Sequence, residues 1–168
     1  MAIYNIPFIY KLSPQHTLSI KQLHHALQLL LKKHQSLRTS LVLDAEKNLL
    51  MQQIIDYNES NHSLFEFIES TFETHEQLNE ILHDEKRNSG HFDLSQGLVF
   101  RCHIVYYKQI SSNDLLSDKD LLIFNFHQAF FDFSSMDVFL DDLNQAYTTG
   151  QLLTNAATDL RYLDCKYK

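Results

Sequence analysis

This chain of 168 residues predicts an α/β fold, a sandwich of a mixed β-sheet and packed helices. Segments whose apolar residues alternate, as in strands, interleave with segments whose apolar residues recur at helical spacing. No internal repeat, low-complexity tract or linker divides the chain. The length is sufficient for one core that buries about 70% of the unfolded surface, so we expect a single domain over residues 1–168.

The first third of the chain predicts a strand, a helix and a hairpin. Residues 3–11 alternate as a strand, and Pro7 fits that strand only at the edge of a sheet, where no backbone donor is needed. Apolar residues at helical spacing predict an amphipathic helix over about 18–35. Residues 37–44 and 49–56 read as two strands joined by the turn "AEKN".

The middle of the chain continues the alternation of element types. We expect a polar loop at 58–63, a short strand at 64–70 and a charged helix at 74–88 with an apolar inner stripe. Residues 98–107 are the clearest strand, because every second residue is apolar. The polar segment 109–120 then reads as a loop.

The last part predicts one more strand and two helices. Residues 121–127 form an apolar run typical of a buried strand. Ser134 with Asp137 three residues later resembles a capping box at the start of a helix. Gly150 can end that helix in a left-handed conformation, and a short final helix is expected at 158–167.

Composition excludes several classes of function. The net charge is -7 and the 14 Lys and Arg residues are scattered, so we expect no binding to nucleic acid. No apolar segment reaches the roughly 20 residues that span a bilayer. The first twenty residues do not show the basic start and long apolar core of a secretion signal. We therefore expect a cytoplasmic protein without a membrane partner. With 3 glycines, a Gly-rich nucleotide-binding loop is also excluded.

The cysteines and histidines indicate neither a metal site nor a nucleophile. Cys102 and Cys165 fit a reducing compartment as free thiols, with a disulfide between them as the alternative. Cys102 falls on the apolar face of its strand, which favours core packing. The 10 histidines show no HExxH motif and no Cys/His ligand spacing, so we expect no bound metal.

Three segments resemble motifs of one protein family. They are "KHQSLRTSL" (33–41), "FDLSQGLVFR" (92–101) and "FHQAFFDFSS" (126–135). In this order they resemble RHExLRTxF, FDLxxGPLxR and HHxxxDG of the condensation domains of nonribosomal peptide synthetases. These domains belong to the chloramphenicol acetyltransferase-like, CoA-dependent acyltransferases. The opening "NIPFIYKLS" and the closing "RYLDCKYK" also resemble segments of that family.

The resemblance implies one half of a chloramphenicol acetyltransferase-like fold. It covers the N-terminal subdomain of a condensation domain, and the C-terminal subdomain is absent. In the family, an active-site tunnel between the two halves joins a carrier-bound acyl thioester to an amine, forming an amide. Phosphopantetheine-linked or CoA thioesters would then be substrates, with no bound cofactor. A carrier protein or the missing C-terminal half would be the partner.

The resemblance also assigns site residues and shows where the motif has changed. Gln128 occupies the position of the family's catalytic histidine, and an amide cannot accept a proton near neutral pH. Loss of a general base costs about 10²- to 10⁴-fold in rate. Asp132 would be structural. Arg38 would form a buried structural ion pair, for which Asp132 is one possible partner.

His127 is unsuited to replace the lost base. Adjacent residues of a strand face opposite sides, so His127 should face away from Gln128, and a hydrogen-bonded structural role is the simpler interpretation. Phe133 occupies the glycine position of the motif and cannot cheaply adopt a positive φ, so the turn must differ or be strained. The acidic stretch 137–142 reads as a helix start with a solvated face.

We therefore expect a condensation-like fragment that is inactive alone. Two alternatives remain. One is a non-catalytic relative that binds a carrier protein or an acyl group. The other is an acyltransferase of the same superfamily that acts on an alcohol.

Overall fold

The computed structural model describes residues 4–58 and 64–152 of the chain. The expected helix at 158–167, the Tyr162 and Asp164 positions of the last motif, and Cys165 lie outside the described residues.

A four-stranded mixed sheet forms the centre of the fold, in the order β1-β8-β6-β5. Its strands are β1 Asn5–Tyr10, β5 Glu66–Phe72, β6 Phe100–Tyr107 and β8 Leu121–His127. β5 runs parallel to β6, whereas β8 is antiparallel to both β1 and β6. The predicted fold class is therefore confirmed. The predicted edge position of the strand that contains Pro7 is also confirmed, because β1 lies at one end of the sheet.

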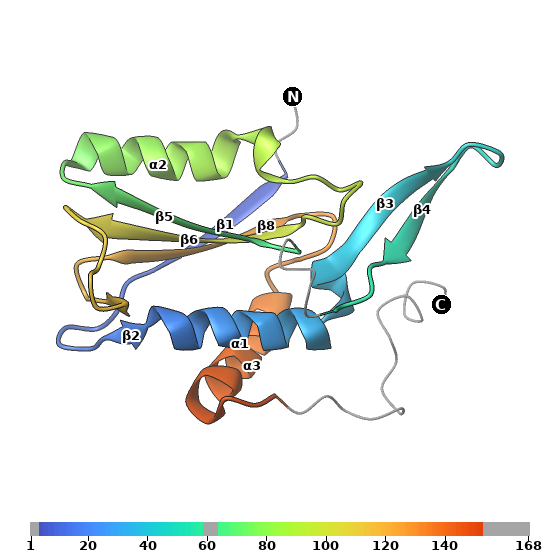
Figure 1. Cartoon of the computed structure of the whole chain (residues 1–168). Helices are drawn as coiled ribbons and strands as arrows, with labels where there is room; N and C mark the ends of the chain where they lie inside the picture. Colours follow the sequence, from blue (N-terminus) through green and yellow to red (C-terminus); the bar gives the residue numbers. More distant parts are fainter. Residues whose placement is uncertain (1–3, 59–63, 153–168) are drawn as a thin grey trace.

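Helices cover both faces of this sheet (Figure 1). α1 Ile20–Lys33 and α3 Ser135–Thr149 lie together on one face, and α2 His75–Arg87 lies on the other. All three were expected from helical periodicity. None of the helices within 4–58 and 64–152 combines the length and the apolar character that crossing a membrane requires.

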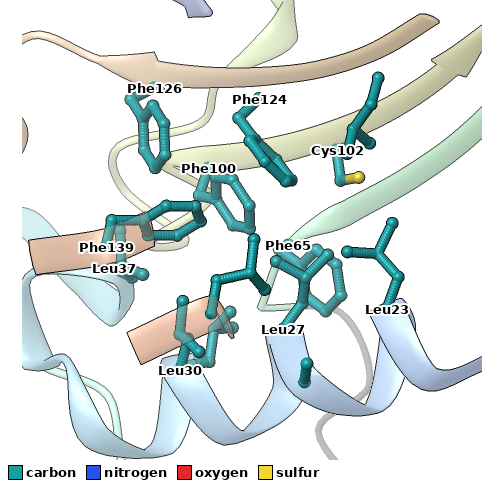
Figure 2. Close-up of a cluster of buried hydrophobic side chains, with 14 of the residues drawn as sticks. Leu23, Leu27, Leu30, Leu37, Phe65, Phe100, Cys102, Phe124, Phe126 and Phe139 are labelled. Atoms are coloured by element: carbon teal, nitrogen blue, oxygen red, sulfur yellow. The ribbon is translucent and has the colours of Figure 1, made fainter. Parts of the chain in front are cut away.

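Aromatic and leucine side chains form the main core between the sheet and α1 with α3. Figure 2 shows leucines of α1 pointing towards Phe100, Phe124 and Phe126 of the sheet. The rings of Phe126 and Phe131 stack at 3.7 Å between centroids, and Phe100 stacks on Phe126 at 4.8 Å. Phe139 of α3 meets several of these rings edge-on. Offset and edge-to-face contacts of this kind stabilise a core beyond the area that they bury.

The predicted hairpin is confirmed and projects from the main sheet (Figure 1). It consists of β3 Thr39–Asp44 and β4 Leu49–Ile54, which pair only with each other. The short 3-10 helix Gln35–Arg38 connects α1 to β3. The outer end of the hairpin exposes apolar side chains: Val42, Leu43, Leu49, Leu50 and Met51.

Two features of the expected loops differ from the sequence prediction. Residues within 109–120 contribute β7 Leu115–Leu116, which pairs with β2 Leu18–Ser19 ahead of α1. A second 3-10 helix, Ser89–His91, follows α2. Elements of two or three residues are too short to produce a recognisable periodicity.

The start of α3 differs from the expected capping box. Ser134 has helical backbone angles and its side chain forms no capping hydrogen bond, so the Ser134–Asp137 interpretation is wrong. Asp132 instead accepts hydrogen bonds from the Ser135 backbone N–H at 2.8 Å and from the Ser135 hydroxyl at 2.7 Å. The other end of α3 is as expected, with Gly150 at φ 69°.

A buried charge cluster connects α2 to the sheet. Glu85 is 1% exposed and accepts from Arg101 at 2.9 Å and from His103 at 2.6 Å through Oε1. Asn125 donates to Glu85 Oε2 at 2.7 Å, and the side chains of Asn125 and Asn5 both donate to the Glu85 backbone carbonyl. Burial alone raises the pKa of Glu85, but the hydrogen bonds from His103 and Asn125 and the charge of Arg101 lower it to about 2.

The sequence contained a signal for this cluster. Leu78, Ile81 and Leu82 form the expected inner stripe of α2 and pack against the sheet. Glu85 follows at the next position of the same stripe, seven residues after Leu78. Helical spacing therefore placed a carboxylate at the sheet surface, where a buried charge requires partners.

Replacing Glu85 by alanine should destabilise the fold strongly. The change leaves His103 buried without its carboxylate and leaves Glu66 as the remaining partner of Arg101, and breaking a buried pair costs about 3–5 kcal/mol. Urea unfolding measures this difference. Glu80→Ala, at an exposed site of the same helix, is the matched control and should change the free energy of unfolding by less than about 0.5 kcal/mol. Equal effects of the two substitutions would contradict the role of the cluster.

The low pKa of Glu85 also predicts a loss of stability in acid. The pKa of Glu85 falls from its ordinary 4.5 to about 2 in the folded chain, so folding favours the ionised carboxylate. This stabilisation is complete above the unfolded pKa and is lost as the pH falls from about 4.5 towards 2. Unfolding free energies measured across this range should decline less steeply in Glu85→Gln. The same slope in both proteins would exclude Glu85 as the cause.

Candidate active-site loop

The candidate site is the loop that follows β8, where the motif residues lie. Along β8 the side chains alternate, so that Phe124 and Phe126 enter the core below the sheet while Asn125 joins the Glu85 cluster above it. His127 is the last residue of β8 and continues the side of Asn125. The imidazole of His127 therefore points away from the aromatic core.

Two aromatic rings and one backbone hydrogen bond position His127. The imidazole lies 5.5 Å from the Tyr4 ring and 5.7 Å from the Phe92 ring. The backbone N–H of Ala129 donates to Nδ1 at 3.2 Å, so Nδ1 is the unprotonated nitrogen. Burial lowers the pKa of His127. The residue is therefore a neutral imidazole whose basic nitrogen is already used inside its own turn.

Gln128 lies beyond the strand and is exposed. Its backbone N–H donates to the carbonyl of Tyr4 at 2.8 Å, which continues the contact between β8 and β1 by one residue. Position 128 is thus held by the backbone, with its side chain at the surface. The amide can donate and accept hydrogen bonds there, but it cannot remove a proton.

Asp132 stabilises the loop by binding the start of α3. Its contacts to Ser135 satisfy one of the free N–H groups of the first helical turn. The Ser135 hydroxyl and backbone N–H lower the pKa of Asp132, so the carboxylate remains ionised. This is the arrangement expected of a structural aspartate.

Phe133 lies in a turn that needs no left-handed residue at its position. It is absent from the described non-glycine residues with positive φ, which are Gln15, Asn48, Lys108 and Asp114. The backbone at Phe133 therefore carries no left-handed strain, whereas the difference from the family's turn stays a prediction. The ring is 74% exposed and meets Phe8 edge-on at 5.5 Å.

Arg38 is buried and structural, but its partners are backbone carbonyls. Nε donates to the Leu31 carbonyl at 3.0 Å, and the Nη atoms donate to the carbonyls of Lys32 and Ile55. Burial lowers the pKa of Arg38 and the charge of Asp56 raises it. Within the described residues no carboxylate forms a salt bridge with Arg38, so its suggested pairing with Asp132 is wrong. The guanidinium instead connects the end of α1 to the hairpin.

The structure therefore brings three of the four expected residues together. His127 ends β8, and Gln128 and Asp132 follow it in the loop. Arg38 instead binds backbone carbonyls at the base of the hairpin. Across the described part of the chain, no group of three His, Cys, Asp or Glu side chains is arranged to hold a metal ion. Cys102 is buried in the core as expected, and burial raises the pKa of its thiol well above the ordinary value.

A second polar group beside this loop was not predicted. Asp142 is 8% exposed, and its carboxylate accepts from His34 Nε2 at 2.6 Å and from Lys33 Nζ at 2.8 Å. The expectation of a solvated face for 137–142 is therefore wrong at Asp142. Its spacing was informative, because Asp142 directly precedes Leu143 and lies three residues after Phe139, on the buried side of α3.

The sequence comparisons identify relatives over nearly the whole chain. Residues 1–164 match the family model described as Condensation domain. The chain is 27% identical to one of the subunits of linear gramicidin synthase from Brevibacillus parabrevis and 29% identical to the hybrid PKS-NRPS synthetase LUC5 of Fusarium sp.. Each alignment covers 96% of this chain but 2% and 4% of the respective relative, so the chain spans a small part of their length.

Solved structures share the fold at low sequence identity. The epimerization domain from the third module of tyrocidine synthetase B superposes with a TM-score of 0.68 at 18% identity. The X-domain from teicoplanin biosynthesis gives 0.67 at 24% identity. Each match covers 96% of this chain, and 34% and 32% of the respective structure.

The environment of His127 predicts a neutral residue at neutral pH. Because the Tyr4 and Phe92 rings shield the imidazole, its pKa should lie below the ordinary 6.5, with the proton on Nε2. ¹⁵N–¹H NMR titration measures both properties, and His127→Gln assigns the resonance. Tyr4→Ala uncovers the ring and should move the pKa upwards. Titration above 6.5 or a protonated Nδ1 would contradict this geometry.

Proposed function

This chain belongs to the condensation-domain family, and we propose that it is the N-terminal lobe of a condensation-type acyltransferase that cannot form amide bonds by itself. In the reaction that the family resemblance implies, an amine attacks a carrier-bound acyl thioester. The attacking amine must be neutral and must lose a proton as the amide forms. A basic side chain beside the attacking nitrogen supplies that function.

The observation that carries this proposal is the exposed amide of Gln128 at the end of β8. An amide can position an amine through its carbonyl oxygen, but it has no accessible protonated form near neutral pH. Loss of general-base assistance accounts for a reduction of about 10²- to 10⁴-fold. The side chain of Gln128 is exposed, so water is not excluded from its amide either.

His127 is an unsuitable replacement for this base. Its Nδ1 accepts the Ala129 N–H, and its ring lies between Tyr4 and Phe92 on the side of the sheet that carries α2. To reach the position of Gln128, the end of β8 would have to slip by one residue. That slip would move Phe126 out of its stack with Phe131.

Non-catalytic binding is a second candidate, favoured by the same exposed amide. Gln128 retains one donor group and one acceptor where a thioester carbonyl or an amine could hydrogen-bond. Among the structural neighbours, the X-domain from teicoplanin biosynthesis has been solved in a complex with OxyB. A domain of this fold can therefore act as a binding surface for another protein, and a carrier protein is the partner that we propose for this chain.

A thioester assay tests the catalytic part of the proposal. The 168-residue chain is incubated with an acyl N-acetylcysteamine thioester, a mimic of phosphopantetheine, and a primary amine. We expect amide formation at the uncatalysed rate, because the base is missing. Gln128→Leu is the matched control, since it removes the amide at an exposed site. Amide formation by the unmodified chain that Gln128→Leu abolishes would refute the proposal.

The same proteins test binding. If Gln128 contacts the thioester, its side-chain NH₂ resonances should shift on titration with the N-acetylcysteamine thioester or with a thioester-loaded carrier protein. Gln128→Leu should bind several-fold more weakly, in proportion to one lost hydrogen bond. Equal affinity of the two proteins would exclude Gln128 from the binding surface.

A further inference from the structure

We propose that the pocket between the end of α1 and the start of α3 is a binding site for a small neutral aromatic alcohol. Its polar wall is the imidazole of His34 with the hydroxyls of Ser36 and Ser135. Its apolar wall consists of Leu37, Phe131, Val138 and Phe139. This inference is independent of the acyltransferase proposal, because it concerns binding without any reaction.

The contacts of His34 define the hydrogen-bonding character of the pocket. A carboxylate accepts but does not donate, so His34 Nε2 carries the proton that it shares with Asp142 over 2.6 Å. Lys33 balances the charge of Asp142 at 2.8 Å, and burial lowers the pKa of His34. The imidazole is therefore neutral, and its Nδ1 is an acceptor directed away from Asp142. No described side chain donates to this nitrogen.

The two serines complete the polar wall with unequal roles. The Ser135 hydroxyl gives its proton to Asp132 at 2.7 Å, so its oxygen can only accept from a ligand. The Ser36 hydroxyl forms no hydrogen bond with another described residue and can donate. A ligand hydroxyl matches this set, because it both donates and accepts. The pocket disfavours an anion, because an anion would face mainly hydrogen-bond acceptors. The nearby cation, Lys33, already forms a salt bridge with Asp142.

The size and the lining of the pocket favour a ligand with an aromatic ring. The pocket encloses about 160 Å³, close to the roughly 150 Å³ of an apolar protein cavity that takes up benzene. Phe131 and Phe139 provide ring faces and edges, and Leu37 provides an aliphatic surface. A single six-membered ring with one hydroxyl fits this space.

Phenol is the probe that tests this site, and benzene is its matched control. Titration of the ¹³C-methyl-labelled 168-residue chain should give saturable shifts of the Leu37 and Val138 methyl resonances with phenol. Benzene lacks the hydroxyl and should bind about two- to tenfold more weakly, the value of one neutral hydrogen bond. Equal affinity for the two probes would refute the assigned role of the polar wall.

Two substitutions distinguish the contribution of the polar wall to binding from that of the pocket as a whole. His34→Gln places an amide nitrogen where Nε2 donates to Asp142 and moves the acceptor away from the position of Nδ1, so the affinity for phenol should fall towards that for benzene. Val138 is 56% exposed, so Val138→Trp should fill the mouth without unfolding the chain and abolish binding of both probes. Val138→Ala is the matched control and should retain binding. Absence of saturable shifts, or unchanged phenol affinity in Val138→Trp, would overturn the proposal.

Discussion

The pairing of β8 with strands on both of its sides is the constraint on which the rest of this structure depends. Phe126 pairs with Ile6 of β1 and with Phe100 of β6. Because successive residues of a strand face opposite layers, a slip by one residue would bring Asn125 into the aromatic core and Phe126 into the charge cluster. Such a slip would cost free energy on both faces of the sheet. The register of β8 is therefore strongly specified, and the position of His127 is specified with it.

The two layers of the molecule stabilise this register by different physical means. Below the sheet, α1 and α3 contribute apolar and aromatic contacts, which are strong but tolerate many arrangements. Above it, Glu85 requires particular donors from β6 and β8, because an unpaired buried carboxylate is costly. Leu78, Ile81 and Leu82 add apolar contacts on this side too, so the Glu85 cluster adds specificity to a fold that apolar packing stabilises on both faces of the sheet. Asn5 extends the same cluster to β1, so three strands are aligned against one turn of α2.

The loop after β8 is held in place mainly by hydrogen bonds to the backbone. Asp132 binds the first turn of α3, and the turn accommodates Phe133 without a positive φ. The exposed side chain of Gln128 is an amide, which cannot accept a proton near neutral pH. The fold of the loop depends on hydrogen bonds to the backbone, so the loop can keep its shape independently of the side chain at position 128.

The amino-acid sequence was sufficient for the type and order of the long helices and strands and for the edge position of Pro7. These features follow from local periodicity and from the chemistry of single residues. The partners of the buried polar groups were decided only by the tertiary structure. Helical spacing placed Glu85 and Asp142 on inner faces, but their partners come from distant segments of the chain. Arg38 binds carbonyls rather than Asp132 for the same reason, since the choice of partner depends on which groups packing brings within hydrogen-bonding distance.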